Sequence, residues 1–298
     1  MSLWPAKAAD VEAAGISIRT KTREAAEIHP HVKWLVHTGL IILAFLEFYP
    51  MILALLMSFK TNTQYFLHPY SLTFPLHVSN YVEAFAVIWR YMLNSVAVVS
   101  MSLVGTLTVS TLGGFVLGRY RFPGREVLYY MLIALMMVPG VLTMVPQFVL
   151  ISHFHMVNTW WGLVFPYIAG GEIFSIFLLR QFMMGLSQEL FDAAQVDGAS
   201  MWQEFWNIAL PSVRPIIAVI AVNHIVGWWN DLIWPSIVLT NPKWMTLMPG
   251  LYSFTGQYET NIGPLMAGYV IGSIPLVILF LFTSRMFVEG MNSGAFKL

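Results

Sequence analysis

Residues 186–215 read LSQELFDAAQVDGASMWQEFWNIALPSVRP and have the pattern of a polar, water-facing pair of helices. The segment carries the carboxylates Glu189, Asp192, Asp197 and Glu204, although only 10% of the chain is charged. Long apolar stretches flank the segment on both sides. This arrangement predicts a membrane protein in which a soluble partner acts on residues 186–215.

Turn and capping residues divide the segment into two helices. Asp197-Gly198 interrupts the helical pattern, as a glycine just past a helix end does. Ser200 and Gln203 form an S-x-x-Q capping box at the start of the second helix. Pro211 is predicted to end that helix, and Pro215 to lie in the first turn of the next one. The apolar face predicted for the first helix consists of Leu186, Leu190, Ala193, Ala194 and Val196.

The composition of the whole chain is that of a polytopic membrane protein. Of its 298 residues, 57% are hydrophobic, and the mean hydropathy is +0.68. Soluble domains carry about 25% charged residues, well above the fraction found here. The net charge of zero gives no basis for nucleic-acid binding. The absence of cysteine excludes disulfides, thiolate metal sites and cysteine nucleophiles.

Six apolar stretches are long enough to cross a bilayer, for which a helix needs about 20 residues. They are residues 34–58, 92–118, 127–150, 159–181, 213–239 and 264–287. Residues 1–33 are predicted to form a cytoplasmic tail, and residues 34–298 the transmembrane domain. The expected fold class is therefore all-α, with six transmembrane helices.

Basic residues set the expected orientation. With the N-terminus inside, all 15 Lys and Arg residues except Lys60, Arg90 and Lys243 fall at cytoplasmic positions, as the positive-inside rule requires. Both termini are then cytoplasmic, and residues 186–212 lie in the cytoplasm between spans four and five.

The outer loops predicted by this topology carry prolines and aromatic residues. They are residues 59–91, 151–158 and 240–263. Ordered aromatic loops suit docking of an external partner, but aromatic residues also anchor membrane proteins at the lipid–water interface. The sequence leaves both interpretations open.

Polar side chains within spans are functional candidates, because they are costly to bury in lipid. The carboxylates are Glu47, Glu172 and Asp231. Helical spacing in span five places Asn223, Gly227 and Asn230 on one face, and His224, Trp228 and Asp231 on its neighbour. Polar groups beside a tryptophan suit a sugar site. Interhelical hydrogen bonding is the alternative role for the same residues.

The 186–215 segment resembles the coupling loop, or EAA loop, of ABC importer permeases. The matching positions are Asp192-Ala193-Ala194, Asp197-Gly198-Ala199, Phe205 and Ile208-Ala209-Leu210-Pro211, with Asp192 in place of the usual glutamate. Further segments resemble the carbohydrate-uptake, maltose-type branch of that family. They are Val138-Pro139, Val145-Pro146, Leu178-Leu179-Arg180-Gln181-Phe182, Trp229-Asn230-Asp231-Leu232-Ile233-Trp234-Pro235 and the ending Val288–Lys297.

The resemblance implies a multi-pass permease of the cell inner membrane that works with other subunits. Residues 186–212 would dock on a dimer of ATP-binding-cassette ATPases, which bind the ATP and magnesium, so this chain needs no cofactor of its own. A second homologous permease and an extracytoplasmic solute-binding protein would complete the importer. The substrate implied is a carbohydrate, favoured to be an oligosaccharide. The ATPase-coupling residues expected are Glu189, Asp192, Ala193, Ala194, Asp197, Gly198, Ala199, Phe205, Leu210 and Pro211.

Two other function classes compete with this hypothesis. An ion-coupled secondary transporter would use Glu47, Glu172 or Asp231 as coupling groups and would need no cytoplasmic partner. A membrane-embedded enzyme is disfavoured because the sequence offers no metal-ligand motif and no nucleophile–base set. No phosphate-binding G-x-x-x-x-G-K-[ST] loop occurs either, so ATP hydrolysis would belong to another subunit.

Overall fold

A computed structural model describes the backbone of residues 30–257 and 261–295 and most side chains between residues 32 and 283. Every regular element in these ranges is a helix, so the all-α prediction is confirmed. The chain divides into two units, Met1–Ala54 and Leu55–Leu298. Most of the predicted N-terminal tail lies outside the described residues.

Helix α2, Pro30–Ser58, supplies the described part of the first unit and matches the first predicted span. Its apolar part, Val32–Ser58, has a mean hydropathy of 2.4 and is long enough to cross a bilayer. Glu47 lies in this helix, three residues before Pro50.

The second unit is built on three long helices, α4 (Ser79–Arg119), α7 (Trp161–Met184) and α14 (Ile262–Ala295). Helices α4 and α7 approach closely because α4 presents glycines to α7. A Cβ added at Gly114 would lie 2.6 Å from the Cβ of Leu179, and one at Gly118 would lie 2.8 Å from the Cβ of Met183. Small residues allow this close backbone approach in membrane bundles.

Two of the predicted spans are broken in the structure. The stretch predicted at 127–150 consists of α5 (Arg125–Met136) and α6 (Gly140–His153), which meet at 101°. Pro139 precedes α6 and is extended, because its ring cannot continue a helix from α5. A proline followed by a glycine indicates a distorted helix, but it does not specify a bend of this size.

The span predicted at 213–239 is also shorter than expected. Helix α11, Arg214–Trp229, ends at Asn230, and α12, Ile233–Val238, begins after a short break. The stretch that passes the length test is instead Met201–Ser212 followed by α11, bent by 71°. The prediction of one continuous helix to residue 239 was therefore wrong, because Asp231 starts a new helix there.

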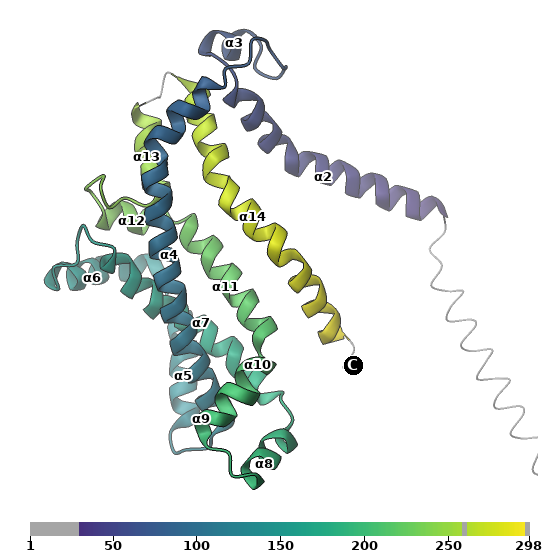
Figure 1. The fold of residues 1–298 in the computed structure, drawn as a ribbon, viewed down its shortest axis with the longest axis vertical. Coiled ribbons are helices and arrows are strands. Elements are labelled where there is room, and N and C mark those ends of the chain that lie inside the picture. The colour runs from purple at the N-terminus through teal and green to yellow at the C-terminus, as the bar shows by residue number, and fades with distance from the viewer. Residues whose placement is uncertain (1–29, 258–260, 296–298) are drawn as a thin grey trace, which may run out of the picture. The chain divides into compact units, whose positions relative to one another are not determined.

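The described residues contain four helices that are long and apolar enough to cross a membrane, or six when each bent pair is taken as one span. They include α4, which begins 13 residues before the span predicted at 92–118. Figure 1 shows α8 and α9 at one end of the second unit and α3 (Asn62–Leu67) at the other. Helix α13, Leu247–Gln257, lies near the α3 end.

Candidate functional site: the helical pair and its anchors

Residues 186–212, here called the helical pair, form two short helices joined by a tight turn. Helix α8 is Gln188–Val196, and the second helix begins with α9, Met201–Glu204. Gly198 adopts φ +79°, a left-handed conformation that favours glycine. Both hydrogen bonds of the capping box between Ser200 and Gln203 are present. The predicted turn and cap are confirmed.

The second helix does not end at Pro211, which corrects the sequence prediction. A π-helical turn, η1 (Phe205–Ala209), is followed by α10 (Leu210–Ser212), and the backbone N–H of Leu210 donates to the carbonyl of Phe205. In this wider turn the N–H bonds to the carbonyl five residues earlier instead of four. The helix therefore continues through Pro211. The bend into α11 falls at Val213 instead.

The apolar face predicted for α8 was wrong, because none of its five residues is buried and the helix packs through Phe191 instead. The side chains of Leu190 and Val196 are 54% and 88% exposed, whereas Phe191 is buried. Phe191 lies beneath the guanidinium of Arg119, 3.9 Å from Cζ to the ring centre. Phe191 is the one buried side chain of this nine-residue helix. Most of its remaining apolar surface is left open to a partner.

Glu204 connects the helical pair to the end of α4. The sequence grouped it with the water-facing carboxylates, but it is only 2% exposed. One carboxylate oxygen accepts a hydrogen bond from the hydroxyl of Tyr120 at 3.0 Å, and the other accepts from Nε2 of Gln195 at 2.9 Å. Burial, reinforced by the bond to Glu204, raises the pKa of Tyr120 to about 12. Glu204 thereby joins α9, α8 and α4.

Asp192 and Gln188 connect α8 to the same end of α4. Arg119 donates to the amide oxygen of Gln188, and its guanidinium lies 3.9 Å from Asp192. Gln188 in turn donates to Asp192 at 2.8 Å. The side chain of Asp192 is still 58% exposed, so it remains accessible to an external cation.

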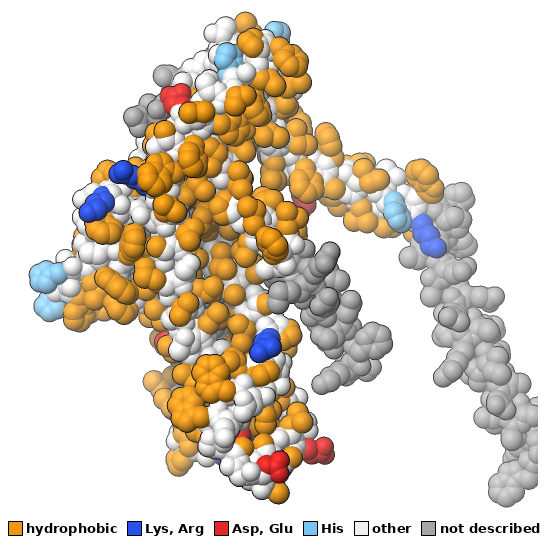
Figure 2. All heavy atoms as spheres, viewed as in Figure 1, with side chains coloured by type: hydrophobic (Ala, Val, Ile, Leu, Met, Phe, Trp, Pro, Cys, Tyr) orange, Lys and Arg blue, Asp and Glu red, His pale blue; other side chains and the backbone are white. Residues whose placement is uncertain are grey.

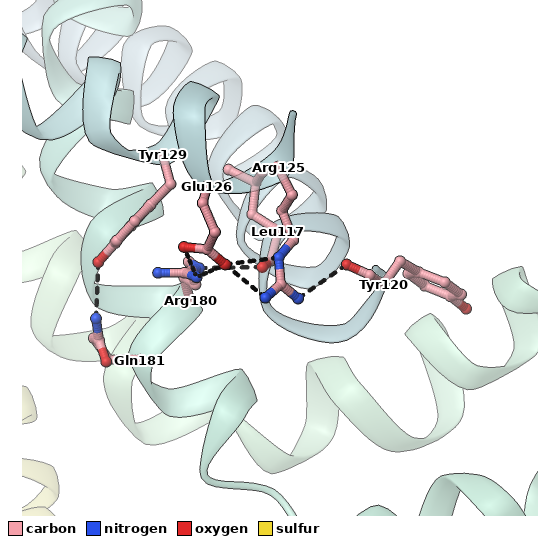
Figure 3. Close-up of polar contacts among 7 residues, drawn as sticks. All are labelled: Leu117, Tyr120, Arg125, Glu126, Tyr129, Arg180 and Gln181. Atoms are coloured by element: carbon pink, nitrogen blue, oxygen red, sulfur yellow. Dashed lines mark hydrogen bonds and ion pairs between the residues drawn. The ribbon is translucent and has the colours of Figure 1, made fainter. Parts of the chain in front are cut away.

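A second polar network ties α4, α5 and α7 together beside the helical pair (Figure 3). The buried guanidinium of Arg180 on α7 donates to the carbonyl of Leu117 at 3.1 Å and to both carboxylate oxygens of Glu126 at 2.8 and 2.9 Å. Arg180 also lies 3.6 Å from the ring centre of Tyr129. Arg125 donates to the carbonyl of Tyr120, next to the Glu204 bond. The ends of three helices and the helical pair thus form one bonded group.

The hydrophobic core continues through the same joint. Phe205 is buried against Phe115 of α4, with ring centres 5.3 Å apart. The cluster extends into α7 and α11 through the buried residues Leu179, Met183, Phe191, Ala209, Val213, Ile216 and Ile220. A displacement of the helical pair therefore acts on α4, α7 and α11 together.

The predicted coupling residues divide into an exposed set and an internal set. Exposed are Glu189, Asp192, Ala193, Asp197 and Gly198. Half-buried are Ala194, Ala199, Leu210 and Pro211, and Phe205 is buried. No atom would lie within 4 Å of a Cβ at Gly198. The exposed set presents an acidic, small-residue surface around the turn.

One predicted face of α11 is used for internal packing. The ring of Trp228 stacks between those of Tyr167 and His224, with centres 5.3 and 4.7 Å away. His224 is buried and lies 2.7 Å from the hydroxyl of Ser175. Asp231 accepts from the Tyr167 hydroxyl at 2.8 Å and caps α12 at the N–H groups of residues 233 and 234. These residues join α7, α11 and α12.

The other predicted face of α11 is open. Asn223, Gly227 and Asn230 are exposed, and a Cβ at Gly227 would meet nothing within 4 Å. Asn230 bonds to the carbonyl of Val226 in its own helix. Glu172 on α7 is half-buried. Of the candidates for a substrate pathway, Asn223, Gly227 and Asn230 are the exposed ones, so a ligand can reach them.

A cavity of about 860 Å³ lies between α6, α7 and α12. Its walls are mainly apolar and include Met144, Phe165, Tyr167 and Trp234, with Gln147 as a polar side chain. Within the described residues, no group of three His, Asp or Glu side chains is placed to hold a metal ion.

The sequence did not reveal Glu204, Tyr120 and Arg180 as a connected set. Arg180 was noticed only as part of a motif, and Glu204 only as one carboxylate of four. Tyr120, the partner of Glu204, is 84 residues away, and sequence spacing cannot supply that contact.

Comparisons with known proteins agree with this architecture. Residues 110–293 match the family model for the binding-protein-dependent transport system inner membrane component. The arabinooligosaccharides permease AraQ of Halalkalibacterium halodurans is 31% identical over 90% of this chain and 98% of its own. The diacetylchitobiose uptake permease NgcG of Streptomyces coelicolor is 31% identical over 88% of each chain.

A solved structure shows the same fold. It is that of a bacterial ABC transporter involved in the import of the acidic polysaccharide alginate, with a TM-score of 0.74 and 21% identity over 86% of this chain and 96% of that one. The matched family region, residues 110–293, contains the helical pair together with its flanking helices α7 and α11. The chain therefore belongs to the binding-protein-dependent transport system inner membrane components, the permease family that its coupling-loop motif resembles.

Proposed function

We propose that this chain is the permease subunit of an ATP-binding-cassette importer that carries an oligosaccharide across the inner membrane. The observation that carries the proposal is the helical pair: an exposed acidic turn whose buried side is bonded to α4 and packed against α7 and α11. The relatives named for arabinooligosaccharides and diacetylchitobiose support the substrate class. A soluble binding protein delivers the sugar, as the family description implies.

The helical pair works as a rigid joint in this proposal. An ATPase dimer binds the exposed turn around Asp192 and Gly198. When the dimer closes around ATP, it displaces the helical pair. Because Glu204 and Phe205 are fixed to the end of α4, that displacement is passed to the transmembrane helices rather than absorbed locally. A two-state membrane unit then alternates between inward-open and outward-open arrangements. A homologous second permease completes the pathway.

The sugar pathway lies along the exposed face of α11 in this proposal. Asn223 and Asn230 offer amide donors and acceptors to hydroxyl groups, and Gly227 leaves room between them. His224 and Trp228 act behind this face by fixing α11 against α7. Replacing Asn223 with leucine should therefore lower transport while the ATPase stays coupled.

The test is co-purification and transport in proteoliposomes with candidate ATPase subunits, the second permease and the binding protein. Gly198→Pro and Asp192→Lys should each reduce ATPase association and sugar uptake at least about tenfold, the effect of losing about 1.4 kcal/mol. Glu83→Lys makes the same charge change on an exposed carboxylate of α4, away from the helical pair, and serves as the control. If both helical-pair variants retain association and uptake, the proposed function is wrong.

A further inference from the structure

Helix α5 is held to the rest of the second unit by little apolar packing. Of its twelve residues, all within the described part of the chain, only Tyr129 is buried. Its large hydrophobic side chains Val127, Leu128, Tyr130, Met131, Leu135 and Met136 are 44–64% exposed. The position of α5 against α7 therefore depends on the few contacts made by its first two turns.

Those contacts come from two successive residues of α7 (Figure 3). Arg180 is 5% exposed and donates to both carboxylate oxygens of Glu126 and to the carbonyl of Leu117. Gln181 donates to the hydroxyl of Tyr129 at 2.8 Å. Hydrogen bonds between charged groups are stronger than neutral ones. The bonds to Glu126 are thus the main tie between α5 and α7.

An ion pair is an unusual way to fix a helix in this chain. Only 10% of its residues are charged, and Figure 2 shows that hydrophobic side chains cover most of the visible face of the long helices. The bonds of Arg180 leave its charge satisfied although it is buried, as a buried charge requires. The pair is therefore a specific feature of the joint between α5 and α7.

The same ion pair is connected to the helical pair by a series of hydrogen bonds. Arg125 donates to Glu126 at 2.6 and 2.9 Å and to the backbone carbonyl of Tyr120 at 3.2 Å. The hydroxyl of Tyr120 donates to Glu204 of the helical pair. The start of α5 is thus bonded both to α7 and to the end of α4 on which the helical pair is fixed.

The opposite end of α5 has the properties of a hinge. Pro139 has no N–H to bond back to α5, and a Cβ at Gly140 would meet nothing within 4 Å. Met137 beside them is 81% exposed. Beyond this junction, α6 is packed near its far end, where Ile151 is its buried residue. A few residues at the ends of elements are enough to absorb a change of angle.

We propose that the ion pair between Arg180 and Glu126 makes α5 follow the helical pair, so that a displacement by the ATPase turns α5 relative to α6 about residues 137–140. The inference deepens the proposed function and rests on it. Without the pair, the displacement would still reach α4, α7 and α11 through the buried core, but α5 has too little packing to follow them. Arg180 and Glu126 are therefore positioning residues.

The first experiment is a double-mutant cycle on the complete importer in proteoliposomes. Glu126→Gln removes the charge, and Arg180→Lys removes the fork that bonds Glu126 and Leu117 together. Each should lower the number of sugars carried per ATP hydrolysed at least about threefold. The double variant should be no worse than the poorer single variant, because both changes remove the same contact.

Glu83→Gln is the matched control for this cycle. It removes the charge of an exposed carboxylate on α4 outside the network and should leave the ratio of sugar to ATP within about twofold of wild type. Glu126 is 47% exposed, so Glu126→Gln is the variant expected to fold and assemble normally. If Arg180→Lys does not assemble, Glu126→Gln alone decides the outcome.

A distance measurement separates transmitted movement from mere support. The chain has no cysteine, so Met131→Cys on α5 and Val149→Cys on α6, at positions 59% and 62% exposed, can carry two spin labels. In the complete importer, the distance between the labels should shift when ATP binds. Glu126→Gln should abolish most of that shift while the ATPase remains bound.

The outcomes that overturn the inference are distinct from failure of the proposed function. If Glu126→Gln lowers the midpoint of thermal unfolding but leaves the distance shift and the ratio of sugar to ATP unchanged, the pair only supports the fold. Losses that add in the double variant also overturn the inference. If the importer with the unaltered chain carries no sugar when ATP is hydrolysed, the proposed function fails instead.

Discussion

The helical pair and the segment 61–78 each have a buried ionisable side chain among their anchors, Glu204 and Lys60, yet the partners of these two side chains differ. Glu204 accepts hydrogen bonds from Tyr120 and Gln195, which belong to two other elements. Lys60 donates to carbonyls only eight and nine residues further along its own loop. The first arrangement passes movement between helices, whereas the second makes one segment rigid. A buried contact between helices and a buried contact within one loop thus differ in what they can transmit.

The largest effect is expected when the Glu204 contact is removed. Glu204→Ala leaves the Tyr120 hydroxyl without its acceptor and opens a cavity in the joint, a cost of about 2–3 kcal/mol. The number of sugar molecules carried per ATP hydrolysed should fall roughly 10- to 100-fold while the ATPase stays bound. The measurement is parallel uptake and ATP hydrolysis in proteoliposomes.

Asn207→Ala is the matched control for that experiment, because Asn207 is an exposed polar residue on the same helix. It should leave the transport-to-ATP ratio within about twofold of wild type, as surface substitutions away from packed features usually do. A ratio unchanged by Glu204→Ala would show that the contact with Tyr120 does not carry movement.

The sequence predicted the helical pair well because its signals are local. Gly198 and the Ser200 cap are read from spacing alone, and the motif placed them between membrane helices, whereas the end of the second helix was wrongly placed at Pro211. Contacts such as Glu204–Tyr120 and Arg180–Glu126 join residues 84 and 54 positions apart. They depend on how helices pack, which local patterns do not specify.

The breaks in the helices were only partly predictable for the same reason. The Pro139-Gly140 pair indicates a distorted helix, but the 101° angle depends on the packing of α5 and α6. For Asp231 the sequence left two interpretations open, a functional carboxylate and interhelical hydrogen bonding. The structure shows it capping α12 while bonded to Tyr167. A polar residue in a span thus cannot be assigned a role before its neighbours are known.

The Lys60 contact should produce a smaller effect of a different kind. Lys60→Met keeps the length and apolar stem of the side chain but removes the amine that donates to the carbonyls of His68 and Pro69, a cost of about 1–2 kcal/mol. The midpoint of thermal unfolding should fall by about 2–4 °C for each kcal/mol lost. The number of sugars carried per ATP should stay at the wild-type value.

If Lys60→Met instead uncouples transport from ATP hydrolysis, the distinction between the roles of Glu204 and Lys60 is wrong. Lys60→Arg is an informative companion, since its guanidinium can still donate to carbonyls but is bulkier. The midpoint of thermal unfolding of Lys60→Arg should lie between those of wild type and Lys60→Met.

The smallest effect is expected in the stability of the fold at alkaline pH, through Tyr120 at the helical pair. The folded-state pKa of Tyr120 is raised from 10.0 to about 12, so its hydrogen bond to Glu204 stabilises the fold fully below pH 10. That stabilisation, about 1 kcal/mol, is lost as the pH rises from 10 to 12. Thermal unfolding of Tyr120→Phe should start at a lower temperature than wild type at pH 8, and the difference should shrink above pH 10.

Lys60 should respond to pH with the opposite sign. Its folded-state pKa is lowered by burial, so its contribution to stability increases with pH up to the unfolded value near 10.5. The stability difference between wild type and Lys60→Met should therefore widen towards that pH. A difference that narrows over the same range as that of Tyr120→Phe would contradict the assignment of distinct contacts to the two ends.

The most direct test of the central claim is a cross-link from the exposed tip of the helical pair to an ATPase subunit. Val196 is 88% exposed, and the chain has no other cysteine to compete with a Val196→Cys thiol. In the assembled complex, a short bifunctional reagent should join this thiol to the ATPase and stop sugar uptake. Full uptake with the thiol modified and no ATPase cross-link would contradict the account.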